Sequence, residues 1–315
     1  MAKKDERSYE KTIASTYKDL YSFEPTNLDK ILFPDDGITK GDLIDYYRKI
    51  SGFMLPHMKD RPVTMHRFPS GIGKSGFFQQ NIQDYFPDWI DRTTINKKEG
   101  GSVTHLLCNN EATLIYLANL ACITPHIWLS RADKLFCPDK IIIDLDPSDG
   151  FEQVRSAAFY IKDVSEKLEL RSFIMLTGSR GLHVAFPLIR SESFDEARSF
   201  SQELANYLVD QNPELFTLEE HKEKRRGSVF LDTLRNSYGQ TSVAPYAVRA
   251  RPGAPVDAPI EWSELDGSGI NSRYYNMGNM INMIKKKRDP WESFYDEAQS
   301  LKRPRLLLKD MLKSQ

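Results

Sequence analysis

Apolar runs of strand length alternate with longer amphipathic stretches through the middle of the chain. Strands are predicted by the runs KIIIDLDP (140–147), RSFIMLTG (171–178), GLHVAFPL (181–188) and GSVFLDTL (227–234). Two stretches between them, 151–170 and 193–211, repeat apolar residues at helical spacing, and the second begins at Ser193, a favourable N-cap. The resulting order β-α-β-β-α-β predicts a split βαβ, ferredoxin-like unit, in which two helices lie on a sheet of mixed direction.

The segments on either side of this unit predict a smaller α/β lobe and a helical tail. Residues 28–47 predict a short apolar element, a turn and a helix capped at Thr39, and 61–82 predict two short extended runs around a glycine-rich loop. A further apolar helix is predicted at 111–120, and the first fifteen residues predict a polar arm or short helix. The tail, which starts at APIEWSEL, predicts helices and carries the basic run Lys285, Lys286, Lys287 and Arg288. We expect one α+β domain over 1–315, divided approximately into an N-terminal lobe (16–135), a palm-like unit (136–260) and a C-terminal helical wrap (261–315).

Composition places the chain among globular proteins. Its 315 residues are 40% hydrophobic and 28% charged, with a mean hydropathy of -0.50, which suits one large domain or two lobes sharing a cleft. No stretch approaches the roughly 18 apolar residues of a membrane span, and the start lacks the apolar core of a signal peptide. We therefore expect a cytoplasmic protein without a membrane partner. Cys108, Cys122 and Cys137 are too few and too widely spaced for a disulfide framework or a closed zinc site, so we interpret them as reduced and structural.

The candidate chemistry begins with Asp144 and Asp146 at the end of an isoleucine-rich strand. Side chains two apart on a strand share a face, and a divalent cation such as Mg²⁺ or Mn²⁺ is the usual relief for two adjacent carboxylates. An acidic strand end that leads into a turn is the alternative. Asp232 lies on a strand that the predicted unit places in the same sheet. Three convergent aspartates predict a two-metal site, in which one ion activates a 3′-hydroxyl and the other stabilises the pyrophosphate of a nucleoside triphosphate.

The turn TGSRGLHV between the second and third predicted strands has the composition of a phosphate site. Its hydroxyls, cationic side chains and glycines are suited to a triphosphate. The residues in question are Thr177, Ser179, Arg180 and His183, with Gly178 and Gly181 freeing backbone amides. A glycine-containing hairpin needs none of these polar groups, and a histidine on an apolar strand can also be a buried core residue.

Local charge is the only electrostatic argument for a polyanionic ligand, because the net charge is -1. Between His221 and Arg251 the basic residues are Lys222, Lys224, Arg225, Arg226, Arg235, Arg249 and Arg251, against Glu223 and Asp232. A solvated face is one explanation of such a run. We favour another, because Arg249 and Arg251 alternate in AVRARPGAP and would share a face beside the acidic site. There, with Arg225, they would balance a triphosphate.

Seven motifs in order span nearly the whole chain: NLDKILFP, ITKGDLIDYY, GFFQQN, IIIDLDP, TGSRGLHVAFPL, SVFLD and VRARPGAPVDAPIEW. Together they closely resemble the polymerase domain of bacterial and archaeal nonhomologous end-joining ligase D. That family belongs to the archaeo-eukaryotic primase superfamily, so the resemblance implies a primase-like two-lobed fold with a ferredoxin- or RRM-like palm. It also implies a template-directed polymerase that fills gaps and extends DNA ends, favours ribonucleotides and uses Mn²⁺ or Mg²⁺. The implied partners are nucleoside triphosphates, gapped duplex with a 5′-phosphate, a Ku-like protein and a separate DNA ligase, at the nucleoid.

The resemblance also implies roles for individual residues. Asp144, Asp146 and Asp232 match the catalytic aspartates. The incoming triphosphate is implied to contact Thr177, Ser179, Arg180, His183, Arg225 and Arg249, with His126 as a further active-site histidine. The 5′-phosphate of the downstream strand is implied to bind Lys30 and Lys40, and the template to stack on Phe77 and Phe78, for which a core aromatic pair is the alternative.

Two departures and two rival functions complete the prediction. Arg180 stands where the family more often has lysine, which keeps the charge. The chain ends at Gln315 without the Lys-x-Asp-Gly motif of a ligase, so we expect a stand-alone polymerase or an excised domain. A metal-dependent phosphatase with Asp144 as nucleophile would leave the hairpin and the arginine pair unexplained. A DNA-end-binding scaffold without catalysis would leave the three aspartates unexplained.

Overall fold

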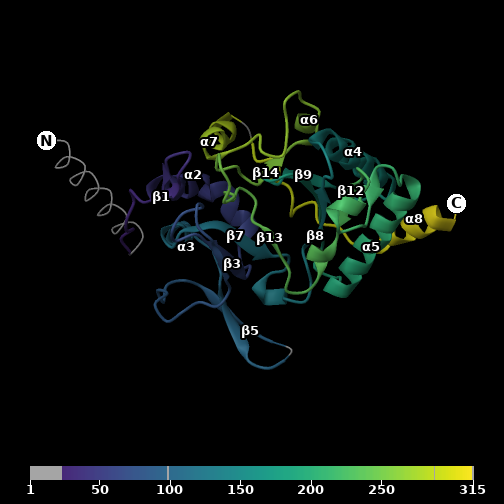
Figure 1. Cartoon of the computed structure of the whole chain (residues 1–315). Coiled ribbons are helices and arrows are strands. Elements are labelled where there is room, and N and C mark those ends of the chain that lie inside the picture. Colours follow the sequence, from purple (N-terminus) through teal and green to yellow (C-terminus); the bar gives the residue numbers. More distant parts are fainter. Residues whose placement is uncertain (1–22, 98, 287, 314–315) are drawn as a thin grey trace.

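The central part of the chain forms a six-stranded sheet in the computed structural model, which describes residues 23–97, 99–286 and 288–313 (Figure 1). The predicted motif consists of β8 (Lys140–Asp146), α4 (Phe151–Lys167), β9 (Phe173–Leu176), β10 (Leu182–Pro187), α5 (Phe194–Gln211) and β12 (Val229–Asp232). Its strands lie in the order β12-β8-β10-β9, and each neighbouring pair is antiparallel. The predicted α+β class with a ferredoxin-like palm is therefore confirmed.

Two edge strands extend this sheet beyond the prediction. β11 (Phe216–Thr217) pairs in parallel with β12, which gives the sheet its mixed direction, and β14 (Ala258–Ile260) pairs antiparallel with β9. The prediction that the chain is helical from Ala258 is wrong at β14, because its three residues are buried against β9. Pro259 is tolerated there because an edge strand does not need every N–H. The rest of the tail forms α6 (Trp262–Leu265), α7 (Met277–Lys286) and α8 (Lys302–Lys313).

A four-stranded sheet in the order β13-β7-β3-β4 lies in the N-terminal part. Its strands are β3 (Val63–Arg67), β4 (Phe77–Gln79), β7 (Cys122–Trp128) and β13 (Thr241–Val243). Because β13 comes from far along the chain and pairs with β7, it joins the two sheets at the site described below. The proposed division into lobes stays a prediction. The predicted arm over the first fifteen residues, and Lys287 of the basic run, lie outside the described residues.

Among the described residues, the N-terminal part also contains two helices, α2 (Lys40–Met58) and α3 (Glu111–Asn119), and two hairpins outside this sheet. α2 begins at Thr39 with a complete capping box, as predicted, and α3 is capped by Asn110. β1 (Ile31–Phe33) and β2 (Ile38–Thr39) form a small hairpin, and β5 (Arg92–Asn96) with β6 (Ser102–Leu106) forms a second hairpin that projects from the body (Figure 1). Short 3-10 turns occur at η1 (Ala132–Lys134), η2 (Lys222–Lys224) and η3 (Leu234–Asn236). Among the described helices, none is long and apolar enough to cross a membrane.

Candidate active site

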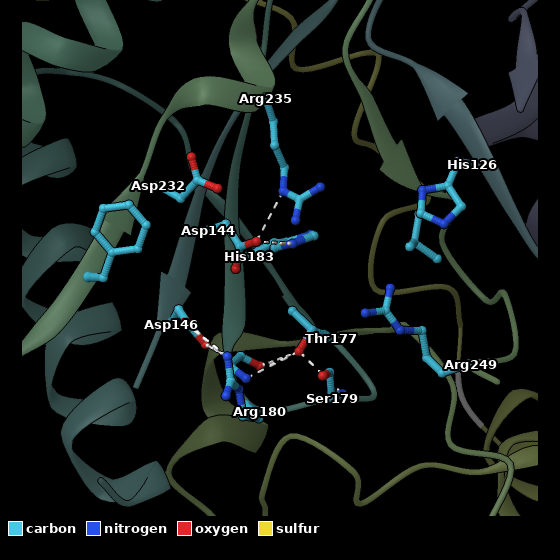
Figure 2. Close-up of a pocket in the computed structure, with 13 residues that line it drawn as sticks. His126, Asp144, Asp146, Thr177, Ser179, Arg180, His183, Asp232, Arg235 and Arg249 are labelled. Carbon is cyan, nitrogen blue, oxygen red and sulfur yellow. Dashed lines mark hydrogen bonds and ion pairs between the residues drawn. The ribbon is translucent and has the colours of Figure 1, made fainter. Parts of the chain in front are cut away.

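The end of β8 lies at the centre of a pocket of about 250 Å³ (Figure 2). Asp144 has two register partners, His183 on β10 and Asp232 on β12. Residues directly opposite one another in a sheet share a face, so these three side chains point to the same side. The pocket is lined by His126, Asp144, Asp146, Thr177, Ser179, Arg180, Gly181, His183, Phe230, Asp232, Arg235, Val243 and Arg249. Of the residues predicted for the catalytic and nucleotide site, Arg225 and Arg251 are not among them.

Asp144 is held by Arg235 and His183. Its Oδ2 accepts a hydrogen bond from Arg235 Nε at 3.0 Å and lies 3.4 Å from His183 Nε2. Burial by itself would raise the pKa of Asp144, but His183 and Arg235 outweigh it and hold this pKa well below its usual 3.8. Asp144 is therefore a carboxylate at neutral pH.

Asp146 is bound by two arginines from different directions. Arg180 Nη2 and Arg225 Nη1 lie 3.1 and 2.9 Å from its carboxylate. Arg225 is buried, and its remaining nitrogens donate to two backbone carbonyls. It supports Asp146 from behind the pocket, whereas the half-exposed Arg180 reaches Asp146 from the pocket side.

Asp232 differs from Asp144, its register partner on β8, because the pKa of Asp232 is raised. Burial and then the negative charge of Asp144 raise this pKa above 3.8, although the N–H of Leu234 donates to Oδ1 at 2.8 Å. A cation between Asp144 and Asp232 would relieve that repulsion, and carboxylate oxygens are the ligands that Mg²⁺ and Mn²⁺ prefer. Within the described part of the chain, no group of three or more His, Cys, Asp or Glu side chains is already gathered as a metal site. The donor chemistry fits such an ion, and the metal role of these aspartates stays a prediction.

The turn between β9 and β10 is closed by Thr177. Its Oγ1 donates to the carbonyl of Gly181 at 2.9 Å and accepts from the Gly181 N–H at 3.2 Å. The Gly181 amide is thus used inside the turn and is not free, contrary to the prediction. A Cβ at Gly181 would lie 1.8 Å from a backbone oxygen of β8, and Gly178 has a φ of +59°. Both glycines therefore let the turn lie against the carboxylates, with Ser179 facing the pocket.

His126 and Arg249 form the opposite wall of the pocket (Figure 2). Burial and then the charge of Arg249 lower the pKa of His126 to about 3, so this imidazole is neutral at pH 7. The predicted strand-like alternation of Arg249 and Arg251 is wrong, because the chain from 249 to 253 is a bend and turn closed by Arg249 N–H on the Pro255 carbonyl at 2.7 Å. Arg249 lines the pocket and Arg251 lies exposed outside it.

Phe77 and Phe78 on β4 are exposed, at 46% and 60%, so the alternative of a core aromatic pair is wrong. The ring of Phe78 stacks on His66 at 4.1 Å and meets His126 edge-on at 5.4 Å. The guanidinium of Arg67 lies over the Phe77 ring at 5.4 Å. The pair is thus an exposed aromatic surface that reaches the pocket through His126.

Lys30 and Lys40 lie close together, but only Lys30 is exposed. Lys40 is buried, and its Nζ donates to the backbone and side-chain oxygens of Asn119 at 3.2 and 3.1 Å. Burial and then the charge of Lys30 lower the pKa of Lys40 to about 8. An anion such as a phosphate would relieve the repulsion between the two lysines.

The model of the LigD primase-polymerase domain matches residues 39–291. The chain belongs to the LigD primase-polymerase family. It is 33% identical to the bifunctional non-homologous end joining protein LigD of Bacillus subtilis, over 87% of this chain and 44% of that protein. It is 33% identical to the multifunctional LigD of Mycolicibacterium smegmatis, over 76% of this chain and 32% of that protein. The solved polymerase domain of Mycobacterium tuberculosis ligase D, in complex with DNA, superposes with a TM-score of 0.81 at 30% identity, covering 87% of this chain and 98% of that one.

Membership of the LigD family confirms the predicted nucleotidyltransferase class and a general polymerase or primase role. The chain spans less than half the length of these curated relatives. The roles of individual residues in this LigD-type domain stay predictions.

Three residues that line the LigD-type pocket, Arg235, Phe230 and Val243, were not predicted from the sequence. The basic run includes Arg235 without distinguishing it, yet Arg235 binds Asp144 and lines the pocket. Its place three residues after Asp232 is the one signal in the sequence that points to it. Phe230 alternates with Asp232 on β12, lies opposite Asp146, and packs under the Arg225 guanidinium at 4.7 Å.

Proposed function

We propose that the chain is a template-directed polymerase that extends DNA ends and fills gaps in nonhomologous end joining, with a preference for ribonucleotides. The observation that carries the proposal is the pairing of Asp144 with Asp232 on adjacent strands, facing a wall that includes Arg249. Carboxylates on one side and guanidinium groups on the other suit a metal-bound triphosphate. The solved Mycobacterium tuberculosis polymerase domain, which is in complex with DNA, supports a DNA substrate.

The three aspartates would hold Mn²⁺ or Mg²⁺, and two bound ions supply activation of the primer 3′-hydroxyl and stabilisation of the pyrophosphate leaving group. Ser179 and Arg180 donate hydrogen bonds to the triphosphate from the turn, and Arg249 does so from the opposite wall. Arg180 is half exposed, so it can leave Asp146 and turn to the ligand. His126, being neutral at pH 7, contacts the ligand without adding charge.

DNA is selected by two surfaces outside the pocket. Phe77 and Phe78 support an unstacked template base, a contact worth about 1–3 kcal/mol per base. Lys30 and Lys40 bind the 5′-phosphate across the gap. Both pairs belong to the N-terminal part, whereas the aspartates belong to the palm, so the gap would lie across the junction of the two sheets.

Primer extension on a gapped duplex with a 5′-phosphate tests the proposal. Wild type with Mn²⁺ should add ribonucleotides faster than deoxyribonucleotides, and Asp144→Ala should add neither. Asp149→Ala is the matched control, because Asp149 is exposed just beyond β8 and does not line the pocket. No incorporation by wild type would refute the polymerase function, and full activity of Asp144→Ala would refute the role of the aspartates.

We further propose a Ku-like protein and a DNA ligase as partners, because the relatives that carry this domain are bifunctional or multifunctional end-joining proteins. Filled gaps should then be sealed when a DNA ligase is added. Sealing by this chain alone would contradict the need for a separate ligase.

A further inference from the structure

Asp257 is a fully buried carboxylate beside the pocket. Neither of its side-chain oxygens has a hydrogen-bond partner among the residues that the structure describes. Its backbone is fixed, since its N–H donates to the carbonyl of Ala247 at 3.0 Å and its carbonyl accepts from the N–H of Tyr246 at 2.6 Å. A buried acid without hydrogen bonds destabilises a fold. Such a group, held so rigidly next to a ligand site, is expected to have a function.

The cation that Asp257 faces is Arg249. Asp257 Oδ2 lies 3.6 Å from Arg249 Nε, and the Arg249 side chain is 23% exposed. On its other side, Arg249 packs so closely on Gly178 that a Cβ there would lie 2.8 Å from Arg249 Cγ. The isolated bridge between Val248 and Val256 fixes the two segments relative to each other. Arg249 therefore has one defined path into the pocket, which Figure 2 shows between His126 and the turn.

We propose that Asp257 is a positioning residue for nucleotide binding. It faces the Nε side of Arg249, so that the two terminal amino groups point at the incoming triphosphate. The inference rests on the proposed function, in which Arg249 contacts that triphosphate. Asp257 does not line the pocket itself, so it acts through Arg249 and not on the ligand.

This role has a signature in the pH dependence of binding. Burial raises the pKa of Asp257 to about 7, opposed by Arg249. The charged and titratable groups that face Asp257 are Arg249, Asp144, Arg235, Tyr46 and Tyr47. A bound triphosphate adds negative charge beside Arg249 and so favours the protonated form of Asp257. Nucleotide binding should then take up a proton at Asp257, and affinity should fall as pH rises through 7.

Steady-state gap filling tests the positioning role. Asp257→Ala should raise KM for the nucleotide about tenfold and change kcat by less than about twofold, since only binding geometry is lost. Arg249→Ala should have at least as large an effect, and the double variant should be no worse than Arg249→Ala alone. Asp257→Asn, which keeps an oxygen beside Nε, should rescue most of the loss. The inference would be overturned if the increases in KM of the two single variants multiplied in the double variant, or if Asp257→Ala left KM unchanged.

The matched control is Asp36→Ala, because Asp36 Oδ2 accepts a hydrogen bond from the Gly253 N–H at 2.8 Å and so supports the same loop without facing Arg249. Its KM should stay within about twofold of wild type, and an equal rise in KM would mean that loop order alone is responsible. A second experiment measures nucleotide affinity between pH 6 and 8 for wild type and for Asp257→Asn. Because the triphosphate titrates equally in both, the difference between the two profiles reports on Asp257. Wild type should lose more affinity above pH 7, and identical profiles would overturn the inference even if Asp257→Ala does not fold. An inactive wild type would refute the proposed function instead.

Discussion

Two groups of buried charged residues lie at the two ends of β8. They differ in how completely hydrogen bonds and ion pairs within the chain compensate their charges. Just before β8, Asp139 Oδ1 accepts a hydrogen bond from Arg61 Nη2 at 2.7 Å, and Asp139 Oδ2 accepts one from Arg131 Nε at 2.9 Å. Arg61 is fully buried, and its Nε and Nη1 donate to the carbonyls of His57 and Trp128. Burial alone would raise the pKa of Asp139, but Arg61 and then Lys140 lower it.

At the other end of β8 two carboxylates, Asp232 and Asp257, are incompletely compensated. Asp232 and Asp257 both have raised pKa values, and Asp257 and the Nδ1 atom of His183 have no hydrogen-bond partner among the described residues. Removing one partner of a buried ion pair leaves an uncompensated charge and destabilises the fold, whereas an incompletely compensated charge beside a pocket can be compensated by a ligand. The comparison predicts opposite results for substitutions at the two ends: loss of stability at Asp139 and loss of activity at Asp144.

The largest effect is expected for Asp144→Asn. The substitution removes the charge that the proposed metal ions need, so the rate of gap filling should fall about 1,000-fold or more. The melting temperature should fall, but less than that of Arg61→Ala, because asparagine keeps an oxygen for Arg235 and His183 while losing the charge that they stabilise. Initial rates with Mn²⁺ and a melting curve measure both. A variant that kept more than about a tenth of the activity would contradict the comparison, and Asp149→Asn serves as control.

Arg61→Ala should give the reverse pattern. Loss of the buried partner leaves Asp139 uncompensated, which costs about 3–5 kcal/mol of unfolding free energy. Urea denaturation measures the loss, and the folded fraction should retain near-normal activity at low temperature. Arg303→Ala is the control, because its ion pair with Glu169 is exposed. If Arg61→Ala were as stable as the control, the Asp139 group would not be a structural junction.

The sequence predicts the palm but not the finer parts of the pocket, for physical reasons. The isoleucine-rich β8 and the amphipathic α4 and α5 have strong local periodicity, and their order determines that Asp144 and Asp232 share a face. The strand β14 is too short, and its partner too distant in sequence, for a local pattern to reveal it. The bond between Arg235 and Asp144 and the burial of Asp257 depend on long-range packing. The amino-acid sequence also does not show that Phe77 and Phe78 are exposed.

Asp257→Asn should change how the unfolding free energy depends on pH. The folded pKa of Asp257, about 7, lies above the unfolded value near 3.8, so the folded state binds more protons between these pH values. Wild type therefore loses stability as pH rises through this window, and the uncharged variant does not. Between pH 5 and pH 8 the unfolding free energy of the variant should therefore rise by about 3 kcal/mol relative to that of wild type. Urea unfolding at both pH values measures the difference, and a gain equal at both would contradict an incompletely compensated charge.

The smallest predicted effect is that of Lys40, which shares features of both groups. It is buried and bonded to Asn119, like the Asp139 group, yet its pKa is lowered to about 8, which leaves its charge incompletely compensated. Lys40→Ala should reduce the preference for a 5′-phosphorylated gap about tenfold, roughly 1.4 kcal/mol, while sparing extension of a simple primer. In wild type that preference should also weaken as pH rises above 8, because Lys40 then loses its proton. Lys302→Ala on the distant α8 is the control. Equal loss on both substrates, with a lowered melting temperature, would instead place Lys40 with Arg61 as a purely structural cation.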